Sequence, residues 1–284
     1  MSALDWFTAA SGVRVPQLIY GTAWKKERTA ELVAQALAAG FRGIDTACQP
    51  KHYDEERVGE AIADALSRRV LRREELYLQT KFTSVDGQDP RRIPYDPRAP
   101  LSEQVAQSFA RSLRNLRTTY LDALVLHSPL ATRAQTSEVW RAMQALCDGQ
   151  RVRQLGLSNC YDLRELRWLC EAHELAPSVL QNRFYAETGY DRELRAYCKE
   201  RGILYQSFWT LSANPRLLAH PTVRSIAAHR AATPAQILFR WLTLEGCAPL
   251  TGTQSAEHMR ESLAIFGIEL GGEERARIGA LLHG

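Results

Sequence analysis

Short apolar runs alternate with amphipathic segments along almost the whole chain. Eight apolar runs each predict a β-strand, at 16–22, 41–46, 75–82, 121–128, 152–159, 178–182, 202–208 and 247–252. The segments between them repeat apolar positions every three to four residues and predict helices, at 27–40, 54–69, 101–117, 136–149, 161–174, 190–201, parts of 222–243, 255–264 and 272–282. Gly40 is placed to end the first helix as a C-terminal cap.

The order of these elements restricts the fold class. Strands that are apolar throughout, each followed by a helix, indicate a parallel sheet covered on both faces. An open doubly wound sheet and a closed barrel both satisfy this pattern. Eight strand–helix units in about 250 residues are usual for the barrel, and the chain lacks the G-x-G-x-x-G motif typical of the open sheet. We therefore predict an α/β fold, an eight-stranded parallel β/α (TIM) barrel, as a single domain over residues 1–284.

The composition of the chain argues against nucleic-acid-binding, membrane-spanning, secreted and metal-binding proteins. The chain is 45% hydrophobic and 24% charged, with a net charge of +4, which is ordinary for a globular protein. Its basic residues are scattered, so we expect no nucleic-acid partner. No apolar run is long enough to span a membrane, and the start lacks the order of a secretory signal. The six isolated cysteines have no metal-site spacing and are typical of reduced thiols, so we expect a cytoplasmic protein without a metal.

Polar residues stand at the ends of successive predicted strands. Asp45, Lys81 and His127 end the second, third and fourth strands, and His52 and Tyr53 follow Asp45 closely. In a β/α barrel the active site lies at the C-terminal ends of the strands. These side chains are therefore expected to meet at the mouth of the barrel.

Each of these residues has an ordinary alternative role. A lone aspartate after a strand is most often a helix cap or a solvated acid, and a lone lysine there is usually exposed. His127 can be a core histidine with satisfied hydrogen bonds, Tyr53 a half-buried aromatic and His52 a surface residue. Their convergence at one predicted mouth favours a functional site.

Several stretches together resemble the aldo-keto reductase family, and the similarity covers nearly the whole chain. The matching stretches, in order, are "GTAWK" (21–25), "GFRGIDTA" (40–47), "LYLQTKF" (76–82), "YLDALVLHSP" (120–129), "GLSNC" (156–160) and "VLQNRFY" (179–185). The resemblance implies a β/α barrel closed at its base by an N-terminal β-hairpin. It also implies reduction of carbonyl compounds with a nicotinamide cofactor.

The resemblance places a catalytic tetrad on Asp45, Tyr53, Lys81 and His127. The family usually has D-T-A-x-x-Y, and here Tyr53 comes three residues later, so its loop must bulge to return the hydroxyl to the mouth. In this interpretation Tyr53 is the general acid, and the Lys81 ammonium lowers its pKa. Asp45 holds Lys81, and His127 orients the carbonyl. His52 is expected to line the rim, to face solvent or to touch substrate.

The same resemblance implies where the cofactor binds. Ser158, Asn159 and Gln181 match residues that bond the nicotinamide carboxamide, and Phe208 matches the ring that stacks on it. The remaining cofactor residues are Trp209, Thr210, Leu211, Asn214, Thr253, His258, Glu261 and Ser262. NADPH is the expected cofactor. NADH is possible because Gly252 and His258 stand where the family often has a lysine and an arginine that bind the 2′-phosphate.

A small-molecule carbonyl compound is the expected substrate, and we expect the protein to be a monomer. Trp24, Phe82 and Trp209 are predicted to line the substrate pocket, with the 83–100 loop at its rim. The chain ends shortly after the last predicted helix, which suggests an open pocket and broad acceptance of aldehydes. Two other functions fit less well. A cofactor-binding regulatory subunit of the same fold would show little turnover. A barrel hydrolase would need two facing carboxylates, and Asp45 is the one convincing candidate.

Overall fold

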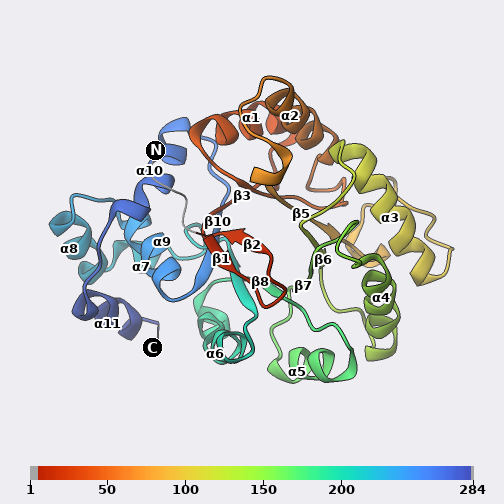
Figure 1. Cartoon of the computed structure of the whole chain (residues 1–284). Helices are drawn as coiled ribbons and strands as arrows, with labels where there is room; N and C mark the ends of the chain where they lie inside the picture. Colours follow the sequence, from red (N-terminus) through yellow and green to blue (C-terminus); the bar gives the residue numbers. More distant parts are fainter. Residues whose placement is uncertain (1–5, 283–284) are drawn as a thin grey trace.

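A computed structural model describes residues 6–282 of the chain (Figure 1). Eight parallel strands close into a barrel in the order β10-β3-β4-β5-β6-β7-β8-β9. The barrel strands are β3 (Ile19–Gly21), β4 (Gly43–Asp45), β5 (Tyr77–Phe82), β6 (Ala123–Leu126), β7 (Leu155–Ser158), β8 (Val179–Arg183), β9 (Leu204–Phe208) and β10 (Cys247–Thr251). The predicted fold class is therefore confirmed. Seven of these strands lie within the predicted apolar runs, and β8 extends one residue beyond its run, to Arg183.

Helices surround the barrel, as Figure 1 shows. They are α1 (Thr29–Ala39), α2 (Glu55–Ser67), α3 (Leu101–Leu116), α4 (Arg133–Leu146), α5 (Leu163–Ala172), α6 (Arg192–Arg201), α7 (Pro215–Ala219), α8 (Pro221–His229), α9 (Pro234–Leu244), α10 (Ala256–Leu263) and α11 (Gly272–Ala280). Side-chain caps set several starts: Asp54 accepts from the Arg57 amide before α2, and Thr132 accepts from the Gln135 amide before α4. Gly40 ends α1 with φ 117°, which confirms the predicted cap.

The N-terminal hairpin closes the base of the barrel. Strands β1 (Trp6–Thr8) and β2 (Arg14–Pro16) pair antiparallel. Val15 packs in one cluster with Tyr77, Ala123 and Leu204, which begin three barrel strands. The predicted strand 16–22 is thus too long: Pro16 belongs to the hairpin, and the barrel strand begins only at Ile19. Because the hairpin covers the base, the C-terminal mouth is the side open to a ligand.

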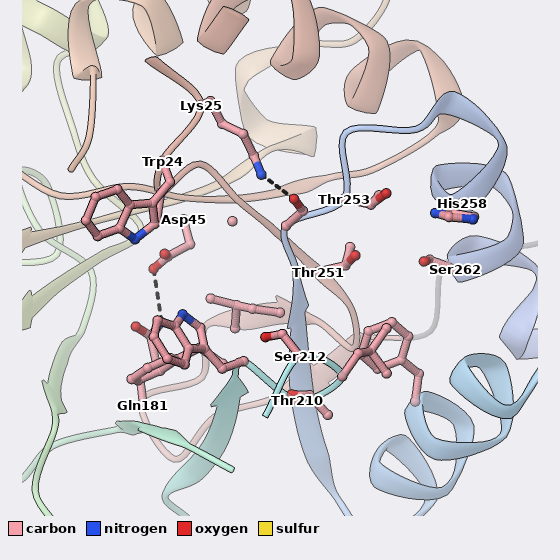
Figure 2. A pocket seen from close by; sticks show the side chains of 18 of the residues that line it. Trp24, Lys25, Asp45, Gln181, Thr210, Ser212, Thr251, Thr253, His258 and Ser262 are labelled. Atoms are coloured by element: carbon pink, nitrogen blue, oxygen red, sulfur yellow. Dashed lines mark hydrogen bonds between the residues drawn. The ribbon is translucent and has the colours of Figure 1, made fainter. Parts of the chain in front are cut away.

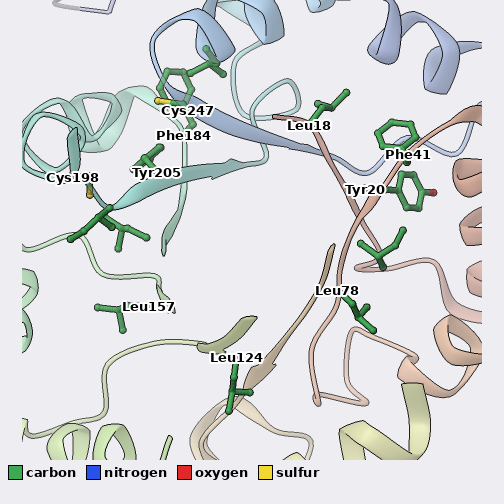
Figure 3. Packing of buried hydrophobic residues seen from close by; sticks show 14 of the residues in the cluster. Leu18, Tyr20, Phe41, Leu78, Leu124, Leu157, Phe184, Cys198, Tyr205 and Cys247 are labelled. Carbon is green, nitrogen blue, oxygen red and sulfur yellow. The ribbon is translucent and has the colours of Figure 1, made fainter. Parts of the chain in front are cut away.

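The apolar core lies between the strands and the surrounding helices. Tyr20, Leu78, Leu124 and Leu157 point outward from their strands into this layer, and all four are buried (Figure 3). The barrel interior differs from the expectation of strands that are apolar throughout. Its upper part holds amide and charged side chains that hydrogen-bond across the barrel, and these belong to the site described below.

None of the helices within residues 6–282 combines the length and the apolar character needed to cross a bilayer. In the same part of the chain, histidine, cysteine, aspartate and glutamate side chains do not gather into a group that could hold a metal ion.

Candidate active site

A buried ion pair lies at the mouth of the barrel. The Lys81 ammonium is 2.6 Å from Asp45 Oδ1, and the two side chains are 1% and 4% exposed. Lys81 also donates to the Thr46 carbonyl oxygen at 2.9 Å. The two residues come from neighbouring strands, β5 and β4. Burial lowers the pKa of Lys81, and the Asp45 carboxylate opposes that shift. These contacts hold the Lys81 ammonium in a fixed position at the mouth.

Glutamine side chains support this pair from inside the barrel. Asp45 Oδ1 also accepts from Gln79 Nε2 at 2.6 Å and from Gln181 Nε2 at 3.0 Å. Gln206 Oε1 accepts from the same two amides, at 2.8 Å and 2.9 Å. A carboxylate that accepts three hydrogen bonds is held in one orientation. Figure 2 shows Gln181 directed at Asp45. Gln79 and Gln206 were not singled out from the sequence, although each lies next to a matched strand end.

Tyr53 and His127 complete the group of four predicted catalytic residues. Tyr53 lies on the loop between β4 and α2, and its ring centroid is 5.2 Å from the Lys81 ammonium. Its ring centroid is 6.0 Å from that of His127, which directly follows β6. The three extra residues before Tyr53 therefore do not carry its ring away from the other three side chains.

The electrostatic effect on Tyr53 differs from the expectation. Burial and the Asp45 carboxylate raise the pKa of Tyr53 well above its usual range, whereas the sequence suggested that Lys81 lowers it. The reason is geometric, because the ammonium is bound to Asp45 and faces the Tyr53 ring at 5.2 Å. The phenol is therefore neutral at all ordinary pH values, so it can act as a proton donor.

His127 is a neutral imidazole with a fixed partner. Burial, Lys81 and His52 lower the pKa of His127 to about 3. Its Nδ1 is 2.7 Å from the Thr83 hydroxyl. If that hydroxyl donates to Nδ1, the proton of the ring resides on Nε2. Thr83 is buried and was not identified from the sequence as part of the site.

The depressed pKa of His127 predicts a loss of stability in acid. The unfolded chain binds a proton on this ring below about pH 6.5, and the folded chain binds it only near pH 3. Stability is therefore fully present above pH 6.5 and is lost as the pH falls from there toward 3, by up to about 1.4 kcal/mol per pH unit. We expect His127→Gln to remove this part of the slope, measured by urea unfolding at several pH values. An equal slope in both proteins would contradict the assignment.

A cavity of about 840 Å³ opens above these residues and runs to the start of α10 (Figure 2). Asp45 and Gln181 lie at one end of it, and His258 and Ser262 on α10 lie at the other. Fifteen of the predicted site residues line it: Trp24, Asp45, Tyr53, His127, Ser158, Asn159, Gln181, Phe208, Trp209, Thr210, Leu211, Thr253, His258, Glu261 and Ser262.

Three predicted residues lie outside the cavity wall. Lys81 is buried and is bound to Asp45. Asn214 is buried and donates to the carbonyl oxygens of Phe184 and Thr210, so it shapes the 209–214 loop from behind. Phe82 is 1% exposed and stacks on Tyr95 in the outer core. Placing Phe82 in the substrate pocket was therefore wrong: side chains alternate along a strand, and Lys81 points inward.

The predicted rim loop lies beside the cavity. Residues 83–100 do not line the main cavity in the described structure, whereas Arg92 lines a neighbouring one of about 580 Å³. Trp24 and His52 line both cavities and stack with ring centroids 3.8 Å apart. The Trp24 amide donates to the His52 carbonyl oxygen at 2.8 Å. His52, left open from the sequence, is thus a wall residue beside Tyr53.

Three residues at the mouth have a left-handed backbone conformation. Trp24, Asn159 and Trp209 have φ values of 63°, 52° and 55°. Residues other than glycine adopt the left-handed region at a cost of about 1 kcal/mol or more, and such residues often cluster at functional sites. Trp24 and Trp209 are also 53% and 47% exposed, which is unusual for tryptophan. The fold holds two aromatic rings at the entrance to the cavity.

The sequence interpretation missed other wall residues. Lys25, Gln49, Ser212, Thr233, Gln236 and Phe239 also line the cavity. Gln236 and Phe239 lie on α9, and Thr233 caps its start. A search restricted to strand ends does not include these residues. Lys25 stood within the quoted "GTAWK" stretch but received no role. Lys25 is buried beside the cavity, and the sequence gives no sign of that burial.

Comparison with known proteins agrees with this geometry. The model of the aldo/keto reductase family matches residues 17–283. An aldo-keto reductase from Mycobacterium sp. (strain JLS) is 31% identical over 95% of this chain and 90% of its own. An NADPH-dependent codeinone reductase from Papaver somniferum is 28% identical over 99% of this chain and 90% of its own. The crystal structure of an aldo/keto reductase from Brucella melitensis is 27% identical, with a TM-score of 0.84 over 98% of this chain and all of its own. With a matching family model over nearly its whole length, the chain belongs to the aldo/keto reductase family, a family of oxidoreductases.

Proposed function

We propose that this protein reduces aldehyde or ketone carbonyls to alcohols with NADPH, and with NADH as a possible alternative. The observation that carries the proposal is the buried Lys81–Asp45 pair beside the rings of Tyr53 and His127, at the mouth of the 840 Å³ cavity. Substrate would enter past Trp24 and Trp209. The names of relatives that are NADPH-dependent reductases support the choice of cofactor.

Tyr53 is the proposed proton donor. A carbonyl that is being reduced gains negative charge on oxygen, and that oxygen takes a proton from a donor within hydrogen-bond reach. The raised pKa of Tyr53 keeps its hydroxyl protonated before the reaction. Loss of the proton leaves a phenolate above Lys81, and the ammonium 5.2 Å from the ring stabilises that charge as it forms. The Lys81 ammonium thus stabilises the phenolate that proton transfer produces.

His127 is the proposed second donor to the carbonyl oxygen. With its pKa near 3 the imidazole is neutral, so it polarises the carbonyl by a hydrogen bond and does not compete with Tyr53 as the acid. The Thr83 hydroxyl on Nδ1 would select the tautomer that has a proton on Nε2. Lys81, Asp45, Gln79 and Gln181 position these groups and do not need to touch the substrate.

Thr83→Val tests the proposed tautomer. We expect kcat to fall about 10-fold with little change in KM, because a valine cannot hold Nδ1 and part of the ring population loses its Nε2 proton. Thr83→Ser, which keeps the hydroxyl, should restore most of the rate. The measurement is steady-state aldehyde reduction. Equal rates for the valine and serine variants would contradict this role of Thr83.

The cavity residues fit a nicotinamide dinucleotide. The wall near Asp45 provides amides and a hydroxyl (Ser158, Asn159, Gln181) and an aromatic ring (Phe208). The other end meets the start of α10, and the N-terminus of a helix favours an anion. We assign the carboxamide to the first group, and the adenosine end to Thr253, His258, Glu261 and Ser262, with residues 209–214 along the middle. When bound, the reduced nicotinamide would supply the hydride.

The competing functions have less support. A hydrolase needs two facing carboxylates. Among the described residues, Asp45 and Glu261 are the carboxylates that line the cavity, and Glu261 lies on α10 at the far end. A regulatory subunit would bind nucleotide without turnover, and no feature of the site favours it over an enzyme. We also propose that the chain acts as a cytoplasmic monomer; its six cysteines are free thiols, which suits a reducing compartment.

The proposed function is tested by mixing the protein with NADPH or NADH and a panel of aromatic and aliphatic aldehydes, while the absorbance of the reduced cofactor is followed. We expect aldehyde-dependent oxidation of the cofactor. Tight nucleotide binding with no oxidation by any aldehyde would favour the regulatory alternative. Comparable rates with NADH and NADPH would agree with the absence of a lysine at 252 and an arginine at 258.

A further inference from the structure

Arg183 is a cation at the end of a barrel strand that the proposed mechanism does not use. It is half-buried and is the last residue of β8, two positions beyond Gln181. Its guanidinium carbon lies 4.0 Å from the centroid of the Trp209 ring and 5.0 Å from that of the Tyr185 ring. None of the ion pairs within residues 6–282 includes Arg183. Its charge is therefore available to bind an anion.

The alternation of side chains along β8 directs Arg183 toward the mouth of the barrel. Gln181 Nε2 donates to Asp45 Oδ1 inside the barrel, whereas Asn182 Nδ2 donates to the Asp191 carboxylate beside α6. Residues two apart on a strand share a face, so Arg183 lies on the face of Gln181 and about 6–7 Å further along the strand. Because the strands end at the mouth, this step leads from the catalytic group toward solvent.

Arg183 adjoins the wall of the 840 Å³ cavity without being part of it. It pairs with Phe208 in the sheet, and both Phe208 and Trp209 line the cavity. Trp209 is 47% exposed, so the guanidinium lies against a ring at the entrance. Figure 2 shows Trp24, the other exposed tryptophan of the entrance, at the same end of the cavity as Gln181. A substrate that enters past the two tryptophans therefore passes the Arg183 guanidinium.

Stacking on Trp209 leaves the edges of the Arg183 guanidinium free. Its five N–H donors lie in the plane of the group, whereas an aromatic ring contacts the face. A carboxylate can accept two parallel hydrogen bonds from such an edge. The carboxylates of the cavity wall in the described structure are not placed to do so. Asp45 is bound to Lys81, and Glu261 lies on α10 at the far end. An incoming carboxylate would thus meet an unoccupied partner.

We propose that Arg183 selects carbonyl substrates that carry a carboxylate remote from the reacting carbonyl. This inference rests on the proposed function and names its substrate class. The aromatic rings of the entrance and the step from Gln181 to Arg183 favour a flat aromatic aldehyde. Its aldehyde and carboxylate groups would stand at opposite positions of the ring. Arg183 contacts the carboxylate alone, so it acts on substrate recognition and not on proton transfer.

The test compares para-carboxybenzaldehyde with its neutral methyl ester, using the full chain and NADPH. We expect the wild type to have a kcat/KM about 10-fold or more higher for the acid. Arg183→Met keeps an apolar side chain against Trp209. It should lower kcat/KM for the acid by about 10- to 100-fold, mainly through KM, and that for the ester by less than about threefold. Arg201→Met, an exposed residue at the end of α6, should leave both values unchanged.

The outcomes separate recognition from packing and from the proposed function. A wild type that reduces the ester as well as the acid, or better, would overturn the role of Arg183. Equal loss for both substrates in Arg183→Met would mean that Arg183 only holds Trp209 in place, which also overturns it. A wild type that reduces neither compound, nor any other aldehyde, would refute the proposed function itself.

Two further measurements test the charge of Arg183 directly. Arg183→Glu should reverse the preference, so that an aldehyde with a para quaternary ammonium group becomes a better substrate than the acid. The preference of the wild type for the acid should shrink with added salt, because the Debye length falls from about 30 Å at about 0.01 M to about 3 Å at about 1 M. A preference that neither shrinks with salt nor reverses in Arg183→Glu would contradict the proposal.

Discussion

Tyr53→Phe is expected to lower kcat by about 10²–10⁴-fold, the usual contribution of a general acid. The substitution removes one oxygen atom and keeps the ring 5.2 Å from the Lys81 ammonium. The carbonyl oxygen therefore loses its proposed proton donor. Cofactor affinity should stay within about threefold of the wild type, because Tyr53 is not assigned to cofactor binding. Single-turnover kinetics with NADPH and an aldehyde measure the effect.

Two comparisons make this result specific. Tyr197→Phe, on the outer helix α6, should react at the wild-type rate. Tyr53→Phe should also remain as stable as the wild type toward urea within about 1 kcal/mol, since the ring is retained. A rate for Tyr53→Phe within a factor of about three of the wild type would show that another group delivers the proton.

Lys81→Met is expected to lower the free energy of unfolding by about 3–5 kcal/mol, the usual cost of breaking a buried ion pair on one side. The Asp45 carboxylate, 4% exposed, would keep only the Gln79 and Gln181 amides as partners. Urea unfolding of the protein without cofactor measures the loss. Activity should fall as well, because nothing then stabilises the phenolate of Tyr53.

The charge explanation is separated from lost packing by a second substitution. Asp45→Asn added to Lys81→Met removes the unpaired charge, so the double variant should regain part of the lost stability. Arg68→Met breaks an ion pair whose side chains are 71% and 57% exposed, and it should cost less than about 1 kcal/mol. Equal stability of Lys81→Met and the wild type would mean that the pair contributes nothing net.

The strands, helices and caps were predictable because their signals are local. Apolar runs and the Gly40 cap depend only on neighbouring residues, and the barrel fold follows from the number and order of the strands. Asp45, Lys81 and His127 were also predictable because a strand end is a definite place in a barrel. Tyr53 needed the resemblance as well, since three additional residues precede it.

The glutamine contacts and the pKa shift of Tyr53 depend on the folded structure and could not be predicted from the order of residues. The glutamines inside the barrel come from β5, β8 and β9, and they contact one another only once the barrel closes. The direction of the pKa shift of Tyr53 depends on which atoms face Lys81. Phe82 was a different case: the alternation of side chains along β5 already excluded it once Lys81 was assigned to the interior.

The most direct test of the central claim follows the hydrogen itself. The wild-type protein is given an aldehyde and NADPH deuterated on one face of the nicotinamide C4, then on the other, and the alcohol is analysed by mass spectrometry. Our account predicts full deuterium transfer to the alcohol carbon from one face and none from the other, because one fixed cavity holds the ring and the carbonyl. Unlabelled alcohol with both forms, or no alcohol despite bound cofactor, would contradict it.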